Sequence, residues 1–187
     1  MNLCFPVTIR GGGGWLGRSM QSFGVTAGLS AYTLGISAKL GSIGSYQTLA
    51  SYSDYNRTPA TERYMILVSN TGNVGLLSDA GTLQYILPSP AIAPGTTVFH
   101  RYHGTQDASN MRFYYDGVEK ASAVSNGVPS ANVADLGTGR DDSSPNNFLN
   151  GATESGFLYL RSGVLSPDWI AAEYSMLNNN ASFVTIT

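Results

Sequence analysis

Residues 111–123 read MRFYYDGVEKASA, and this stretch decides the fold class. In its first half, large apolar side chains at the odd positions alternate with Arg112 and Tyr114, which is the period of a β-strand. Asp116-Gly117 is then the residue pair that a two-residue type I′ turn prefers, because both central residues need a positive φ. The stretch therefore predicts a β-hairpin. An isolated hairpin is only marginally stable in water, so this one must join a larger sheet.

The rest of the chain supplies further short segments with strand character, separated by turn-forming residues. They are residues 32–40, 47–52, 64–68, 75–77, 82–87, 96–102 and 156–161, with a turn over 78–81 and an ambiguous stretch over 128–135. One helix is predicted after Ser166, a candidate N-cap that is followed by Pro167 and by Asp168 in the first turn. Many short strands with one late helix predict an all-β fold, an antiparallel sandwich or jelly roll.

Length and composition favour a single domain with a weakly charged surface. The chain has 187 residues, of which 12 % are charged, against about 25 % in a typical domain. The net charge is −2 and no basic run occurs, which argues against a nucleic-acid partner. No stretch approaches the roughly 20 apolar residues of a membrane-spanning helix. Cys4 is the single cysteine, so no intrachain disulfide can form and no cysteine chemistry is expected.

Residues 1–18 are predicted to form a separate N-terminal arm ahead of a domain that spans residues 19–187. Alternation in residues 1–9 predicts a short strand, and four glycines follow at positions 11–14. Glycines have no side chains to pack and maximal backbone freedom, so they predict a flexible linker. The alternative is an arm that docks on a neighbouring subunit, with Phe5 and Trp15 as anchors. A phosphate-binding loop is not expected, because neither Gly-Lys-Ser/Thr nor a helix pattern follows.

The chain from Ser19 onward resembles the LamG-like, concanavalin A-like jelly-roll family. The resemblance lies in residues 32–39 (YTLGISAK), in the hairpin 111–118 (MRFYYDGV), and in 149–151 (LNG), 158–161 (LYLR) and 165–174 (LSPDWIAAEY). It implies a concanavalin A-like sandwich with one short C-terminal helix. The sequence departs from the family at 151–156 (GATESG), where Gly-x-Ile-Asp-Glu-Val is usual and only the acid Glu154 remains.

Some proteins of this fold are glycoside hydrolases, and the sequence predicts that this one is not an enzyme. Such hydrolases place Glu-x-Asp-x-Glu on one strand, because the period of two puts all three acids on one face. The glutamates of this chain are Glu62, Glu119, Glu154 and Glu173, and none has an acid two residues away. Glu173 is expected at an exposed position of the helix.

The resemblance also suggests a calcium site, since related lectin and LamG folds bind Ca²⁺ through loop oxygens. The best candidates are Asp141, Asp142 and Asn146, with Asn147, in the polar loop 137–148; Asp107 with Asn110 and Asp54 with Asn56 are weaker. An ordinary solvated loop is the alternative, and no cofactor is otherwise required. His100 and His103 lie three apart in a predicted strand, so they should point to opposite faces and not share a metal.

Ligand recognition in such a fold would use aromatic rings and a few polar groups. The candidates are Tyr114, Arg112, Tyr102 and Tyr55, with Tyr52. Sugar rings stack on aromatic faces, and their hydroxyl groups meet polar side chains. The alternative is ordinary packing on a half-buried sheet, where tyrosine is favoured anyway.

Two function classes remain open. One is a virion-displayed accessory protein, such as a phage capsid decoration or tail component, whose residues 1–18 contact virion proteins or other copies of the chain. It is favoured by the glycine-jointed arm and by an N-terminus unlike a signal peptide, where Arg10 follows the apolar residues. The other is a cell-surface or secreted module that binds carbohydrate. A displayed module can also bind glycans, so the two roles are compatible.

Overall fold

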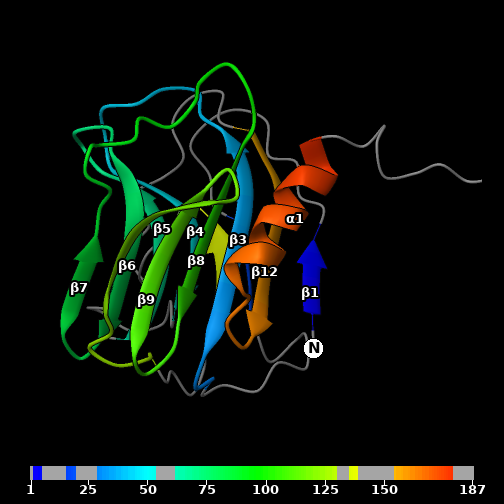
Figure 1. Cartoon of the computed structure of the whole chain (residues 1–187). Helices are drawn as coiled ribbons and strands as arrows, with labels where there is room; N and C mark the ends of the chain where they lie inside the picture. Colours follow the sequence, from blue (N-terminus) through cyan, green and yellow to red (C-terminus); the bar gives the residue numbers. More distant parts are fainter. Residues whose placement is uncertain are drawn as a thin grey trace, which may run out of the picture.

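The computed structural model describes residues 2–5, 16–19, 29–53, 62–129, 135–138 and 154–178. The elements are β1 (Asn2–Phe5), β2 (Leu16–Ser19), β3 (Tyr32–Lys39), β4 (Gln47–Ser53), β5 (Glu62–Val68), β6 (Val74–Ala80), β7 (Leu83–Ile86), β8 (His100–Gln106), β9 (Asn110–Tyr115), β10 (Val118–Val124), β11 (Asp135–Thr138), β12 (Glu154–Ser162) and α1 (Pro167–Asn178). Figure 1 shows their arrangement.

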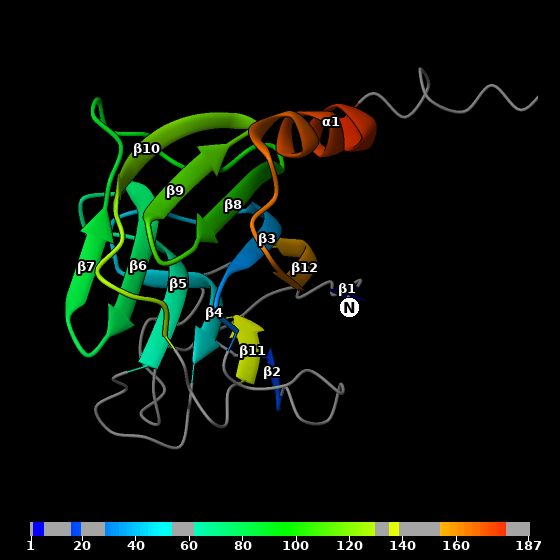
Figure 2. The same cartoon turned by 60° about the horizontal axis from the view of Figure 1, so that its bottom comes forward.

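These strands form two antiparallel sheets. Sheet A has the order β1-β12-β3-β8-β9-β10, and sheet B has the order β2-β11-β4-β5-β6-β7. The sheets face one another as two layers, and α1 lies on the side of sheet A that faces away from sheet B (Figure 2). The predicted all-β antiparallel sandwich with one short C-terminal helix is confirmed. Among the described residues, no helix is long and apolar enough to cross a membrane.

The hairpin that joins β9 to β10 has the predicted turn. Asp116 and Gly117 have φ values of 51° and 78°, the two positive angles that a type I′ turn requires. The Asp116 carboxylate also fixes the turn against β8, because Oδ1 accepts a hydrogen bond of 2.9 Å from the Arg101 backbone N–H. Its Oδ2 lies 2.7 Å from Nδ1 of His100. The hairpin is therefore built into sheet A by side-chain contacts as well as by the strand ladder.

Aromatic rings and aliphatic side chains fill the space between the two sheets. Tyr32 of sheet A packs edge-on against Tyr64 of sheet B, with ring centroids 4.4 Å apart, and lies 5.6 Å from Tyr52. Leu34, Ile36, Ile66, Leu76 and Phe113 are among the fully buried members of this core. Burial of these side chains supplies the main free energy of folding.

Some boundaries differ from the sequence prediction. β8 begins at His100 and not near position 96, and β6 continues to Ala80, so that the chain turns at Gly81, whose φ is 87°. β11 occupies 135–138, at the start of the predicted polar loop. Hydrophobic alternation marks the middle of a strand better than its ends, because the end is set by where pairing stops.

The predicted N-terminal arm contains β1 and all of β2 except its last residue, Ser19. β1 pairs with β12 at the edge of sheet A, and β2 pairs with β11 in sheet B. Both partners belong to the same chain, so at least these eight residues contribute to the sandwich. The division into an arm over 1–18 and a domain over 19–187, and docking of the arm on another subunit, stay predictions.

The helix begins as the sequence predicts. The Trp169 backbone N–H donates 3.2 Å to Ser166 Oγ, which makes Ser166 the N-cap residue. Ile170 is fully buried and packs with Leu165 and Tyr114 against the outer face of sheet A. This cluster holds α1 on the sheet and brings Glu173 of the helix over β8 and β12.

Candidate functional site

The structure separates the residues that the sequence predicts to bind a ligand. Tyr102 and Tyr52 are completely buried in the core between the sheets, where a ligand cannot reach their rings, so the prediction is corrected for both. Tyr114 points to the outer face of sheet A but is only 1 % exposed beneath α1. Arg112 lies on the surface next to it. Tyr55 and the calcium candidates Asp141, Asp142 and Asn146 lie outside the described residues.

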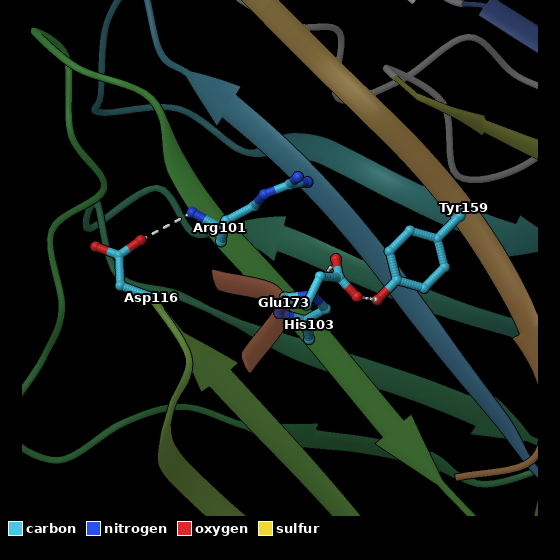
Figure 3. A network of polar contacts seen from close by, with 5 residues as sticks. All are labelled: Arg101, His103, Asp116, Tyr159 and Glu173. Carbon is cyan, nitrogen blue, oxygen red and sulfur yellow. Dashed lines mark hydrogen bonds and ion pairs between the residues drawn. The ribbon is translucent and has the colours of Figure 1, made fainter. Parts of the chain in front are cut away.

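A row of residues across the outer face of sheet A carries a buried polar network. Tyr159, Gly35, His103 and Tyr114 are cross-strand neighbours on β12, β3, β8 and β9. Glu173 of α1 lies over this row (Figure 3). Its Oε2 accepts 2.9 Å from the Tyr159 hydroxyl, and its Oε1 accepts 3.2 Å from His103 Nε2. The expectation of an exposed Glu173 is therefore wrong, because the helix turns it toward the sheet.

The charge state of Glu173 follows from these contacts. Burial alone would raise the pKa of the Glu173 carboxyl, but the hydrogen bond and charge of His103, the hydrogen bond from Tyr159 and the charge of Arg101 outweigh burial and lower it. Burial and the neighbouring Glu173 raise the pKa of Tyr159 far above its ordinary value. The pair is thus a carboxylate bonded to a neutral phenol. It fastens α1 to sheet A, with the Glu173 side chain 22 % exposed, which is consistent with a structural role.

His100 and His103 point to opposite faces, as their spacing predicts. His103 is buried beneath Glu173 on the outer face, whereas His100 stacks on Tyr115, with ring centroids 4.9 Å apart, and contacts Asp116. Among the described residues, no group of three or more His, Cys, Asp or Glu side chains could hold a metal ion. The proposed calcium loop itself is not part of the described chain, so that site stays a prediction.

A hollow of about 170 Å³ lies on the outer face of sheet B, and we call it the sheet-B hollow. Its lining consists of Tyr46, Gln47, Arg63, Met65, Leu67, Leu77 and Tyr85. Met65, Leu67 and Leu77 form a buried apolar cluster separate from the core between the sheets. Tyr46 and Tyr85 stand beside them and are 49 % and 51 % exposed. The hollow thus combines an apolar floor with two accessible aromatic rings.

Strand register explains how this hollow is built. Tyr85 of β7 pairs with Leu77 of β6, which pairs with Met65 of β5 and then with Ser51 of β4. Along this row, an exposed aromatic ring is followed by two buried aliphatic side chains and then by a small, buried serine. In the next row Arg63 lies 3.7 Å from Asp79, which puts a charged pair beside the apolar floor. Neither tyrosine was among the predicted ligand residues.

A second hollow, of about 240 Å³, lies between the start of α1 and strands β8 and β9. It is lined by Thr105, Asp107, Asn110, Arg112, Tyr114, Val164, Leu165, Ser166 and Pro167. It unites two predicted ligand residues, Arg112 and Tyr114, with Asp107 and Asn110, which the sequence considers only for calcium. We call it the β9–α1 hollow.

Comparison with known proteins identifies the family to which the chain belongs. The model of the Laminin_G_3 family, described as the concanavalin A-like lectin/glucanases superfamily, matches residues 18–171. The chain belongs to this family. The resemblance inferred from the hairpin and the C-terminal segments is thereby confirmed. Comparison with curated protein sequences gives no match.

Several solved structures are similar to this Laminin_G_3 chain. One is the CBM40 module of the Ruminococcus gnavus IT-sialidase bound to α2,3-sialyllactose, with 17 % identity and a TM-score of 0.72, covering 92 % of this chain and 98 % of that chain. Another is the NanB sialidase of Streptococcus pneumoniae, with 13 % identity and a TM-score of 0.70, covering 90 % of this chain but 27 % of that chain.

A third is domain 4 of AbnA, a GH43 extracellular arabinanase of Geobacillus stearothermophilus, in complex with arabinotriose. It has 18 % identity and a TM-score of 0.56, and the match covers 79 % of this chain and 67 % of that chain. At these identities the similarity shows a shared fold for the Laminin_G_3 chain and these proteins.

Proposed function

We propose that this protein is a non-catalytic carbohydrate-binding module and that a sugar binds in the sheet-B hollow. The observation that carries the proposal is the pair of half-exposed rings, Tyr46 and Tyr85, beside the buried floor of Met65, Leu67 and Leu77. A pyranose or furanose ring has an apolar C–H face that can stack on a tyrosine. Its hydroxyl groups can reach polar side chains at the edge of the floor, which is the usual composition of a small-ligand site.

Charged groups beside the floor allow more than one class of sugar. Arg63 and Asp79 offer a donor and an acceptor to hydroxyl groups, and a guanidinium also suits a sugar carboxylate. The similar solved structures support the same class of ligand, because one holds sialyllactose and another holds arabinotriose. We propose an extracellular or cell-surface location on the same ground.

The virion role favoured by the sequence receives no support from the fold or from the similar proteins. The glycine-jointed arm was its main structural basis, and part of that arm pairs within the sandwich. The carbohydrate-binding alternative therefore replaces it as the proposed function.

A glycan array followed by isothermal titration calorimetry tests the proposal. The array should include 3′-sialyllactose, 6′-sialyllactose, lactose and arabinotriose. We expect binding to at least one glycan, and a loss of roughly fivefold in affinity for Tyr46→Ala and for Tyr85→Ala, since a stacked ring is worth ~1 kcal/mol. Trp169→Ala is the matched control, because Trp169 is an aromatic side chain, 58 % exposed, on α1. A silent array, or equal losses in all three variants, would contradict the proposal.

A further inference from the structure

We propose that the sheet-B hollow is selective for neutral sugars, and that Asp79, held beside Arg63, is the residue that excludes a sugar carboxylate. This inference rests on the proposed function, which leaves neutral and acidic sugars open, and narrows it to one class of ligand. Asp79 is thus a specificity-determining residue outside the two stacking rings. The hollow can bind a sugar whether or not this selectivity holds, so the two proposals can fail separately.

The first argument is that positive charge is scarce on this sheet. Among the described residues that line the hollow, Arg63 is the only cation, and the other six lining side chains are uncharged. Arg63 is also the only cation among the side chains that the structure describes on sheet B, whereas both lysines, Lys39 and Lys120, lie on sheet A. A sugar carboxylate on the floor of the hollow would therefore depend on this one guanidinium.

The second argument is that the guanidinium already has a carboxylate beside it. Asp79 is the cross-strand neighbour of Arg63, and its Oδ2 lies 3.7 Å from Arg63 Nε. Both side chains are mostly buried, with exposed fractions of 13 % for Asp79 and 16 % for Arg63. Solvent and salt screen a partly buried pair only weakly, so the two charges largely offset one another. An anion in the hollow would meet little net positive charge.

The third argument is that a turn holds Asp79 in place. Its Oδ1 accepts a hydrogen bond of 3.2 Å from the Gly81 backbone N–H, at the turn where the φ of Gly81 is 87°. The carboxylate is thus fixed by the connection between β6 and β7 as well as by its ion pair. A sugar carboxylate bound to Arg63 would share the guanidinium with a second, fixed carboxylate. Repulsion between the two anions disfavours such a ligand.

A neutral sugar avoids this repulsion. Its C–H face can stack on the half-exposed ring of Tyr46 or Tyr85 without any need for net charge. Its hydroxyl groups both donate and accept hydrogen bonds, so they suit a guanidinium and a carboxylate that stand side by side. The site therefore selects by repelling the wrong ligand as well as by attracting the right one.

Isothermal titration calorimetry of the 187-residue chain tests this selectivity. The probes are lactose and arabinotriose, which are neutral, and 3′-sialyllactose, which is acidic. We expect the wild type to bind one of the neutral sugars at least as tightly as 3′-sialyllactose. Asp79→Asn removes the charge but keeps an oxygen for the Gly81 N–H. It should raise the affinity for 3′-sialyllactose by roughly fivefold and change the affinity for the neutral sugars by less than about twofold.

Two further variants show where the gain comes from. The double variant with Arg63→Gln and Asp79→Asn should lose the gain, because the carboxylate then has no guanidinium to bind. Glu154→Gln is the matched control, since it also removes one negative charge beside a cation, Lys39, but on the other sheet. It should leave all three affinities unchanged. No gain in Asp79→Asn, or an equal gain in Glu154→Gln, would overturn the selectivity.

Salt dependence gives a second measurement on the wild type, which needs no substitution. The affinity for the sugar that binds most tightly should change little between about 50 and about 500 mM NaCl, because no ionic contact holds it. A loss of more than about threefold over this range would contradict the inference.

The failure of this inference differs from the failure of the proposed function. If 3′-sialyllactose binds more tightly than both neutral sugars and Tyr85→Ala weakens that binding, the selectivity is overturned and the proposed function stands. If neither the wild type nor Asp79→Asn binds any of the three sugars, both are overturned.

Discussion

The Tyr159 hydroxyl donates a hydrogen bond of 2.9 Å to Glu173 Oε2, and this contact ties the central part of sheet A to helix α1. Tyr159 can make it because its cross-strand neighbour on β3 is Gly35, over which the ring lies. His103 completes the arrangement from β8. Strands β8 and β12 and the helix are thus joined through one carboxylate.

Replacement of Glu173 should therefore weaken the whole molecule. We expect Glu173→Gln to lower the free energy of unfolding by about 1–2 kcal/mol, because hydrogen bonds to a charged group are lost in a partly buried place. Urea unfolding followed by circular dichroism measures this. Glu119→Gln is the control, since the exposed Arg112–Glu119 pair should contribute less than about 0.5 kcal/mol. Equal effects of the two substitutions would show that the Glu173 contacts are not structural.

The same carboxylate predicts a dependence of stability on acid. The folded protein lowers the pKa of Glu173 below its ordinary value of 4.5. A lowered pKa contributes stability that is present above the ordinary value and is lost as pH falls through the folded one. Urea unfolding at pH 7 and at successively lower pH should show this loss below about pH 4.5. In Glu173→Gln this part of the loss should disappear, and an unchanged profile would argue against the contribution of Glu173.

Gly35 gives a steric prediction. A Cβ at this position would overlap the Tyr159 ring, so Gly35→Ala should displace the ring, break its bond to Glu173 and cost about 1–3 kcal/mol. The cost should fall sharply when Gly35→Ala is made in a Tyr159→Ala background, where the space is free. Unfolding measurements on the four proteins of this cycle test the contact. An equal cost in both backgrounds would mean that Gly35 is required for another reason.

The N-terminal strand gives a prediction on the boundary at residue 18. β1 makes a four-residue pairing with β12 at an edge of sheet A. Deletion of residues 1–5 should lower the melting temperature by about 2–8 °C, because loss of a short edge strand is worth ~1–2 kcal/mol. Scanning calorimetry measures the shift, and light scattering of the same protein measures assembly. An unchanged melt with a lost oligomer would favour the docking arm instead.

The hairpin and the helix could be predicted because local chemistry decides them. Asp116-Gly117 requires a tight turn whatever surrounds it, and Ser166-Pro167 starts a helix by hydrogen bonding and a fixed φ. Alternation also predicts correctly that Arg112 and Tyr114 share a face. These features need no information from distant parts of the chain.

Local sequence patterns could not predict which face of a strand is turned toward the core, which is covered by the helix and which is exposed to solvent. Tyr102 and Tyr114 both lie on strands with alternating pattern, but one faces the opposing sheet and the other lies beneath α1. Which face the helix covers depends on contacts between residues about 60 positions apart, such as Tyr114 with Ile170. Glu173 was misplaced for the same reason.

The alternation of apolar residues in the sequence contains one indication of the sheet-B hollow. In residues 83–87, alternation places Leu83, Tyr85 and Leu87 on one face of the strand and Ile86 on the other. Of these four side chains, only Ile86 is buried in the core. The larger apolar set is thus left outside, where it is 42–51 % exposed. An edge strand that points its aromatic side outward is a reason to look for a ligand there.

The most direct test of the central claim is a crystal structure of the protein with the glycan that binds most tightly on the array. We predict electron density for a sugar ring stacked on Tyr85 or Tyr46, over the floor formed by Met65, Leu67 and Leu77. Density for the glycan at another surface, with these two rings still exposed to solvent, would contradict the assignment of the sheet-B hollow as the carbohydrate-binding site.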